Sequence, residues 1–68
     1  MNNIKQLLIN AITDQDSRAI RRLLNDAVET GAVSADEAVK LGHLADVMYT
    51  GSYDVRKRAA ASALALVK

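Results

Sequence analysis

Apolar residues recur along this chain at intervals of three and four, in four successive stretches separated by short polar segments. Residues spaced i, i+3, i+4 and i+7 lie on one face of an α-helix, so each stretch predicts one amphipathic helix. Alternation of apolar and polar residues, which would indicate a strand, is not found. We therefore predict an all-α fold: a compact bundle of about four short helices, with residues 1–68 forming a single helical domain.

Polar start signals and glycines place the ends of the first two helices. The first is expected from about Asn3 to Ile12, with Asn2 or Asn3 as its cap. Thr13-Asp14-Gln15-Asp16 resembles a capping box and predicts the start of the second helix at Thr13. Gly31 is expected to end that helix.

The strongest start signal is Ser34, because Glu37 follows three residues later and can complete a capping box. The third helix is then expected to end at Gly51, and Ser52 or Asp54 to cap the fourth. The third and fourth helices should form the tightest hairpin.

Each predicted helix has one apolar face, and the face of the third is widest, which favours a central position for that helix. The expected core faces are Ile4, Leu7, Leu8, Ala11 and Ile12; Ile20, Leu23, Leu24, Ala27 and Val28; Ala38, Leu41, Ala45 and Met48, with Val39, Leu44 and Val47 beside them; and Val55, Ala59, Ala60, Ala63, Leu64, Leu66 and Val67.

The composition argues against catalysis and against binding of a metal or cofactor. The chain lacks Cys, which excludes disulfides and Cys-type zinc sites, and His43 alone cannot form a closed metal site. The three glycines are isolated, so no phosphate-binding loop is present. No serine has a nucleophile–base arrangement around it. We expect no catalytic, cofactor-binding or metal-binding residues, and a protein that is not an enzyme.

The end of the chain predicts self-association. Residues 59–67 contain no charge, and a helix that is apolar on all sides is normally buried. A domain of this size also gains stability from a partner subunit. We expect a homo-oligomer, most simply a homodimer, that uses Ala61, Leu64 and Ala65.

Three arginines on the second predicted helix, Arg18, Arg21 and Arg22, share a face at i, i+3 and i+4. This face can bind an acidic protein partner. The equally favoured alternative is pairing within the helix, Asp14 with Arg18 and Arg22 with Asp26.

Residues 44–58 resemble a bacterial helix-turn-helix DNA-binding motif, with Ala45 and Val55 at the paired core positions. The motif's turn glycine is replaced by Tyr49, and Gly51 comes two residues late. The resemblance implies DNA contacts by Tyr53, Arg56, Lys57 and Arg58. In the alternative interpretation these residues form a solvated first turn in which Arg58 pairs with Asp54.

Asp54-Val55-Arg56 and the alanine-rich segment after it resemble one helix of a HEAT-type repeat. The spacing from Val55 to Leu64 is one residue too long for the signature, and a solenoid needs about three repeats. An alanine-rich packing helix explains the segment better.

The chain carries nine basic and eight acidic residues, a net charge of +1, which lacks the basic footprint of most DNA-binding domains. The N-terminus lacks a signal-peptide layout, and no apolar run is long enough to span a membrane, so a cytoplasmic location is expected.

We predict a small non-enzymatic regulator, adaptor or inhibitor, of the kind carried by phages and mobile elements, that docks on a protein. The alternative is a small helix-turn-helix DNA-binding protein.

Overall fold

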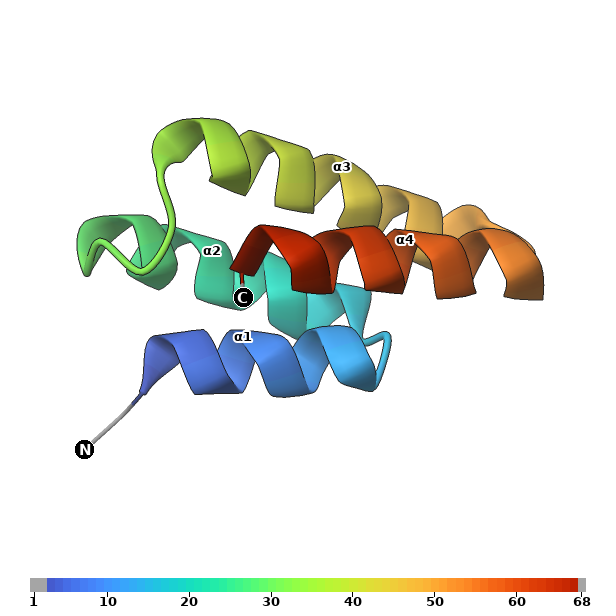
Figure 1. The fold of residues 1–68 in the computed structure, drawn as a ribbon, viewed down its shortest axis with the longest axis horizontal. Helices are drawn as coiled ribbons and strands as arrows, with labels where there is room; N and C mark the ends of the chain where they lie inside the picture. The colour runs from blue at the N-terminus through green and yellow to red at the C-terminus, as the bar shows by residue number, and fades with distance from the viewer. Residues whose placement is uncertain (1–2, 68) are drawn as a thin grey trace.

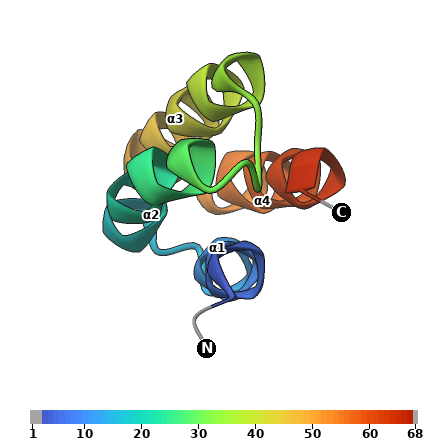
Figure 2. The same cartoon turned by 90° about the vertical axis from the view of Figure 1, so that its left-hand side faces the viewer.

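A computed structural model describes residues 3–67 and contains four helices in that range: α1 (Ile4–Thr13), α2 (Ser17–Glu29), α3 (Ala35–Thr50) and α4 (Tyr53–Val67). Each helix runs antiparallel to the preceding one, and α4 returns beside α1 (Figures 1 and 2). The predicted all-α bundle of four short helices is confirmed. None of the described helices combines the length and apolar character needed to cross a bilayer.

The start of α1 is as predicted, but the start of α2 is not. Asn3 caps α1, accepting a hydrogen bond from the Gln6 N–H at 3.1 Å; Asn2 lies outside the described residues. Thr13 belongs to α1, and its hydroxyl donates to the Ile9 carbonyl oxygen at 2.8 Å. The predicted capping box at Thr13 is therefore wrong, because Asp16 caps α2 by accepting from the Ala19 N–H at 3.1 Å.

Helix α2 is terminated by a left-handed residue that follows its cap, Gly31, with φ +78°, as the sequence predicts. The Gly31 N–H donates to the Val28 carbonyl at 3.1 Å and the Ala32 N–H to the Ala27 carbonyl at 2.8 Å. These two bonds form a Schellman motif, which satisfies carbonyl groups at the helix end. The motif turns the chain inward, so Val33 is buried in the loop before α3.

The predicted capping box of α3 is confirmed in both directions. The Glu37 N–H donates to the Ser34 hydroxyl at 3.1 Å, and the Ser34 N–H donates to the Glu37 carboxylate at 2.9 Å. Gly51 ends α3, also as predicted, with its N–H donating to the Val47 carbonyl at 2.7 Å. Ser52 precedes α4, and its carbonyl accepts from the Arg56 N–H at 2.8 Å.

The core is a narrow aliphatic stripe along the bundle axis, and its largest fully buried side chains are Leu8, Ile12, Ile20 and Leu41. Alanines of α4 complete it, and α3 packs against α4 about as extensively as against α2. Four valines or leucines expected in the core are exposed instead: Leu7, Val28, Val39 and Val55. Each short helix packs against two neighbours, so only part of a wide apolar face can be covered.

Candidate functional site

A largely apolar groove lies between α3 and α4, with a volume of about 560 Å³. We call it the α3–α4 groove; it is lined by Val39, Lys40, His43, Leu44, Ser62, Ala65 and Leu66. Val39 is 74% exposed, more than any other large aliphatic residue in the described part of the chain. Leu44 and Leu66 are half-buried behind it, so the groove extends the apolar core to the surface.

Of the three polar residues that line the groove, Lys40 and His43 belong to α3 and Ser62 to α4. Lys40 and His43 are exposed and lie about one helical turn apart on α3, beside the apolar groove residues Val39 and Leu44. A partner that fills the groove with apolar side chains and places a carboxylate near Lys40 or His43 would be complementary to it. Among the described residues no set of His, Cys, Asp and Glu could hold a metal ion, so His43 has no metal-binding companions there.

The sequence pattern did not predict the α3–α4 groove as a site, although Ala65 was predicted for self-association. Val39 was placed in the core because it lies beside the buried line of α3. The signal that could have found the groove is the spacing 39, 40, 43 and 44, which forms a second stripe on α3 beside the buried one.

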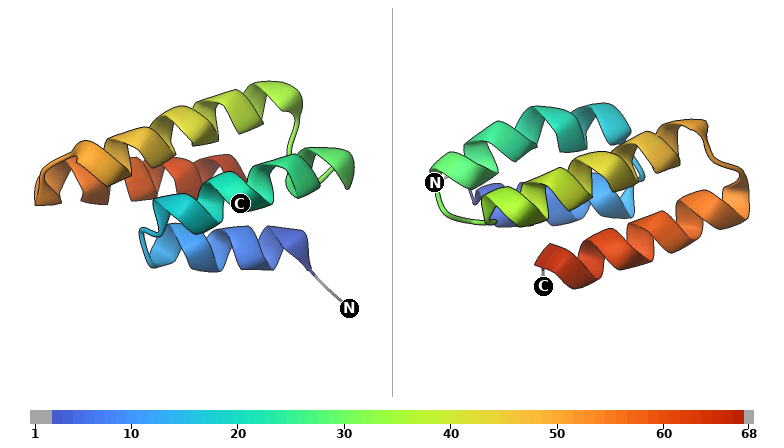
Figure 3. Two further views of the ribbon diagram at one scale, coloured as in Figure 1. Left: turned by 180° about the vertical axis from the view of Figure 1, so that it is seen from behind. Right: turned by 90° about the horizontal axis from the view of Figure 1, so that it is seen from above.

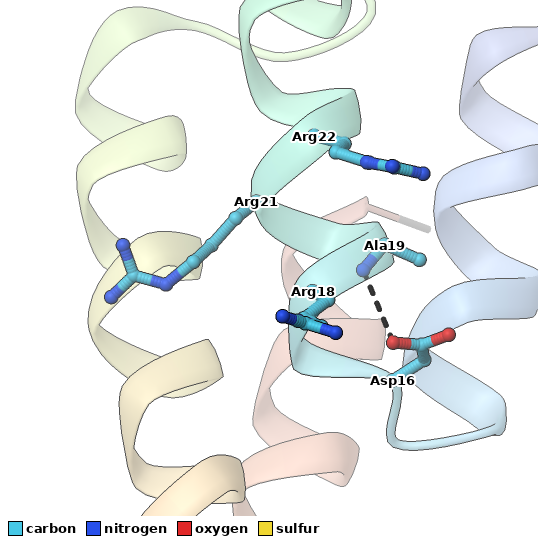
Figure 4. Close-up of a pocket in the computed structure, with 5 residues that line it drawn as sticks. All are labelled: Asp16, Arg18, Ala19, Arg21 and Arg22. Atoms are coloured by element: carbon cyan, nitrogen blue, oxygen red, sulfur yellow. Dashed lines mark hydrogen bonds between the residues drawn. The ribbon is translucent and has the colours of Figure 1, made fainter.

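The three arginines of α2 do line one shallow hollow together with Asp16 and Ala19, of about 530 Å³. Their side chains diverge, however (Figure 4). Arg21 reaches toward α3, whereas Arg22 points toward α1. The sequence correctly placed Arg18, Arg21 and Arg22 on one helix face, but the structure does not bring their guanidinium groups to a common point.

Arg21 forms an ion pair with Asp46 of α3. Between residues 3 and 67 this is the ion pair that forms, and the predicted pairs Asp14–Arg18 and Arg22–Asp26 do not. Both side chains of the pair are more than half exposed, so it contributes at most about 1 kcal/mol. Arg18 and Arg22 keep their positive charge available to a partner.

The residues predicted for self-association are divided by the fold. Leu64 is half-buried and packs against the core, whereas Ala61 and Ala65 are exposed on the outer side of α4. The uncharged stretch 59–67 is partly covered within one chain, because Ala59, Ala60, Ala63 and Val67 are buried. The exposed part is narrower than the sequence suggested, and Ala65 lies within the α3–α4 groove.

The segment that resembles a helix-turn-helix is an antiparallel hairpin in which α3 and α4 lie side by side (Figure 3). In a helix-turn-helix the two helices cross at about 90–120°. The hairpin therefore does not present α4 as a recognition helix. Tyr53, Lys57 and Arg58 are exposed and Arg56 is half-buried; the alternative pairing of Arg58 with Asp54 does not form in the described part of the chain.

One carboxyl group at the start of α3 has a shifted pKa. The pKa of Glu37 is lowered, chiefly by the hydrogen bond from the Ser34 backbone N–H and then by the Ser34 side chain, with smaller effects of Lys40 and Lys5. The capping box therefore favours the ionised carboxylate. This shift is explained by helix capping and does not indicate a catalytic acid.

Comparison of the chain with models of known protein families, with curated proteins and with solved structures gives no match.

Proposed function

We propose that this protein is a small non-enzymatic regulator that binds another protein through the α3–α4 groove. The observation that supports the proposal is the exposure of Val39 in a groove continuous with the core. A monomer gains nothing from exposing such a residue in a concave apolar surface, whereas a docking site does.

The chemistry of the groove defines the partner segment. Two roughly antiparallel helices leave between them a trough suited to an amphipathic helix, whose apolar side chains would contact Val39, Leu44 and Leu66. An acidic residue beside these anchors would meet Lys40 or His43. Binding would act by occlusion: the bundle covers the partner's helix and keeps other proteins away from it.

The arginines of α2 lie on a different element from the groove and form a second candidate contact. Arg18 and Arg22 are free to attract acids of a larger partner, whereas Arg21 already pairs with Asp46. Such exposed charges mainly affect association rate and its salt dependence. The groove is therefore expected to determine residence time, and the arginines the rate of capture.

The test is capture of partners from cells of the native host by tagged variants. Val39→Glu places a charge in the groove and should abolish capture. Val28→Glu is the matched control, because Val28 is an exposed valine on α2, away from the groove. Partner recovery that is equal for the two variants would contradict the proposal.

A photo-crosslinking amino acid at position 39 gives an independent readout. It should form an adduct with the captured protein, while the same group at exposed Asn25 of α2 should not. A double substitution, Arg18→Glu with Arg22→Glu, should slow capture at low salt without preventing it. If the arginine variant alone loses the partner, the interface lies on α2 instead of on the groove.

A further inference from the structure

The chain has two aromatic residues, Tyr49 and Tyr53, and both are highly exposed at the turn between α3 and α4. Tyr49 is in the last turn of α3 and is 77% exposed; Tyr53 is the first residue of α4 and is 65% exposed. The α3–α4 hairpin extends beyond the ends of α1 and α2, so its tip is not covered by them (Figures 1 and 3). The core is built without either ring.

The same tip holds the chain's surplus of positive charge. Residues 49–58 carry three bases and one acid, a net charge of +2, whereas the remaining residues carry six bases and seven acids, a net charge of −1. The ion pair of the described chain involves Arg21 and Asp46, so it neutralises none of the tip's bases. A chain of near-neutral total charge therefore has a locally cationic end.

A shallow hollow on α4 lies next to these bases. Asp54, Lys57, Arg58 and Ala61 line it, and its volume is about 440 Å³. Lys57 and Arg58 are exposed and can both reach a phosphate there. Arg56 contributes less, because it is half-buried and its Nε has no hydrogen-bond partner among residues 3–67.

We infer that the tip of the α3–α4 hairpin binds single-stranded polynucleotide. Exposed aromatic rings stack on unpaired bases, and neighbouring cations neutralise the phosphates that join them. Duplex DNA fits less well, because its bases are already stacked and the antiparallel hairpin does not present a recognition helix. This site is separate from the α3–α4 groove, which lies at the opposite end of the same hairpin, and does not depend on the proposed function.

The tyrosines themselves report binding, because the chain has no Trp and no Phe. Oligomers of about 12 nucleotides, oligo-dT and oligo-rU, are titrated into the purified full chain while tyrosine emission is followed. Quenching that saturates, together with an affinity that falls with salt, is expected. The two oligomers distinguish DNA from RNA as the source of the shared chemistry.

Variants separate stacking from charge, with fluorescent oligomers and anisotropy as the readout. Tyr49→Ala and Tyr53→Ala should each weaken binding about five-fold or more, and Tyr→Phe at the same positions should restore most of it. Lys57→Ala or Arg58→Ala should reduce the slope of log K against log salt by about 0.7. Arg18→Ala removes the same charge from α2 and is the matched control; Val39→Glu in the groove should also leave binding unchanged.

Several outcomes would overturn the inference. They are no saturable binding at low salt, tighter binding to a duplex of equal length, unchanged affinity after Tyr49→Ala and Tyr53→Ala in variants that keep wild-type helicity, and equal losses for Arg18→Ala and Arg58→Ala. Displacement of the oligomer by polyglutamate at equal charge concentration would also overturn it, since the tip would then be a site for acidic proteins.

Discussion

Gln15 after α1 occupies the same structural position as Gly31 after α2: both are the left-handed residue of a Schellman motif. Gln15 has φ +55° and Gly31 has φ +78°. At the end of α1 the Gln15 N–H donates to the Ile12 carbonyl and the Asp16 N–H to the Ala11 carbonyl, both at 2.9 Å. The two ends differ in that only one has the residue that adopts this conformation without steric cost.

Gln15→Gly is therefore expected to stabilise the protein. The left-handed conformation costs a residue with a side chain about 1–2 kcal/mol, and the added freedom of glycine in the unfolded chain offsets part of the gain. A net gain of up to about 1 kcal/mol should raise the melting midpoint by several degrees. Thermal unfolding followed by circular dichroism measures this change.

The reverse substitution, Gly31→Gln, is the control. No atom lies within 4 Å of a Cβ at this position, so any loss of stability comes from the backbone conformation alone. We expect a lower melting midpoint of similar size. If Gln15→Gly and Gly31→Gln shift the midpoint in the same direction, the equivalence of the two helix ends is wrong.

The glycine that ends α3 is required for a different reason. Gly51 has φ −78°, which any residue adopts, but a Cβ there would lie 2.6 Å from the Val47 carbonyl oxygen and 2.8 Å from Val55 Cγ1. Because the oxygen belongs to the backbone, relief requires the α3–α4 turn to move. Gly51→Ala should destabilise the protein by about 1–3 kcal/mol, measured by urea denaturation.

Gly42→Ala provides the comparison. Gly42 lies inside α3, and a Cβ there would meet Leu24 Cδ1 at 3.7 Å, an ordinary contact. Since alanine is favoured over glycine within a helix by about 1 kcal/mol, this variant should be more stable than the wild type. The changes in the free energy of unfolding caused by Gly42→Ala and Gly51→Ala should therefore have opposite signs. Destabilisation by Gly42→Ala would show that α3 and α2 pack more tightly than the structure indicates.

The sequence predicted the features that depend on local backbone chemistry. Ser34 with Glu37 and the glycine at position 31 could be recognised because their effect is exerted within one helix turn. The start of α2 was missed because Thr13 and Asp16 are both good caps, and the choice between them depends on Gln15 adopting a left-handed conformation that glutamine does not favour. The capping preferences of Thr13 and Asp16 do not decide which of them starts α2.

The candidate sites were less predictable, because they depend on how helices face one another. Arg21 could pair within its own helix or with Asp46, which lies 25 residues later; exposed pairs differ by too little energy for sequence to choose between them. Val39 was expected in the core because it lies beside the apolar line of α3 that contains Leu41 and Ala45. Its exposure follows from the positions of α2 and α4 around α3, which the sequence alone does not specify.

The capping box of α3 should make the free energy of unfolding vary with pH in the acid range. The folded-state pKa of Glu37 is lowered from 4.5, so its contribution to stability is complete above that value and is lost as pH falls through the folded-state pKa. Ser34→Ala should reduce the free energy of unfolding by about 1 kcal/mol at neutral pH. Chemical denaturation between neutral and acid pH measures both effects.

Glu37→Gln separates the charge from the hydrogen bond. Glutamine can still accept from the Ser34 N–H, but it does not titrate, so the part of the acid dependence that arises at Glu37 should disappear. Asp36→Asn is the matched control, because Asp36 lies in the same first turn but is not part of the capping box. A pH profile that Glu37→Gln and Asp36→Asn change equally would indicate a helix-dipole effect instead of the box.

The structure restricts self-association through α4 to the exposed side of that helix. Ala61 and Ala65 are one turn apart on the exposed side of α4, with no charged side chain between residues 59 and 67 to oppose a second copy. Ala61→Glu or Ala65→Glu should convert a dimer into a monomer, as measured by light scattering at high micromolar concentration.

Leu64→Ala differs in mechanism: because Leu64 packs against the core, it should lower stability in the monomer as well. A wild-type protein that is monomeric at that concentration would refute self-association. Since Ala65 also lines the α3–α4 groove, a dimer that does form should dissociate when a partner helix fills the groove.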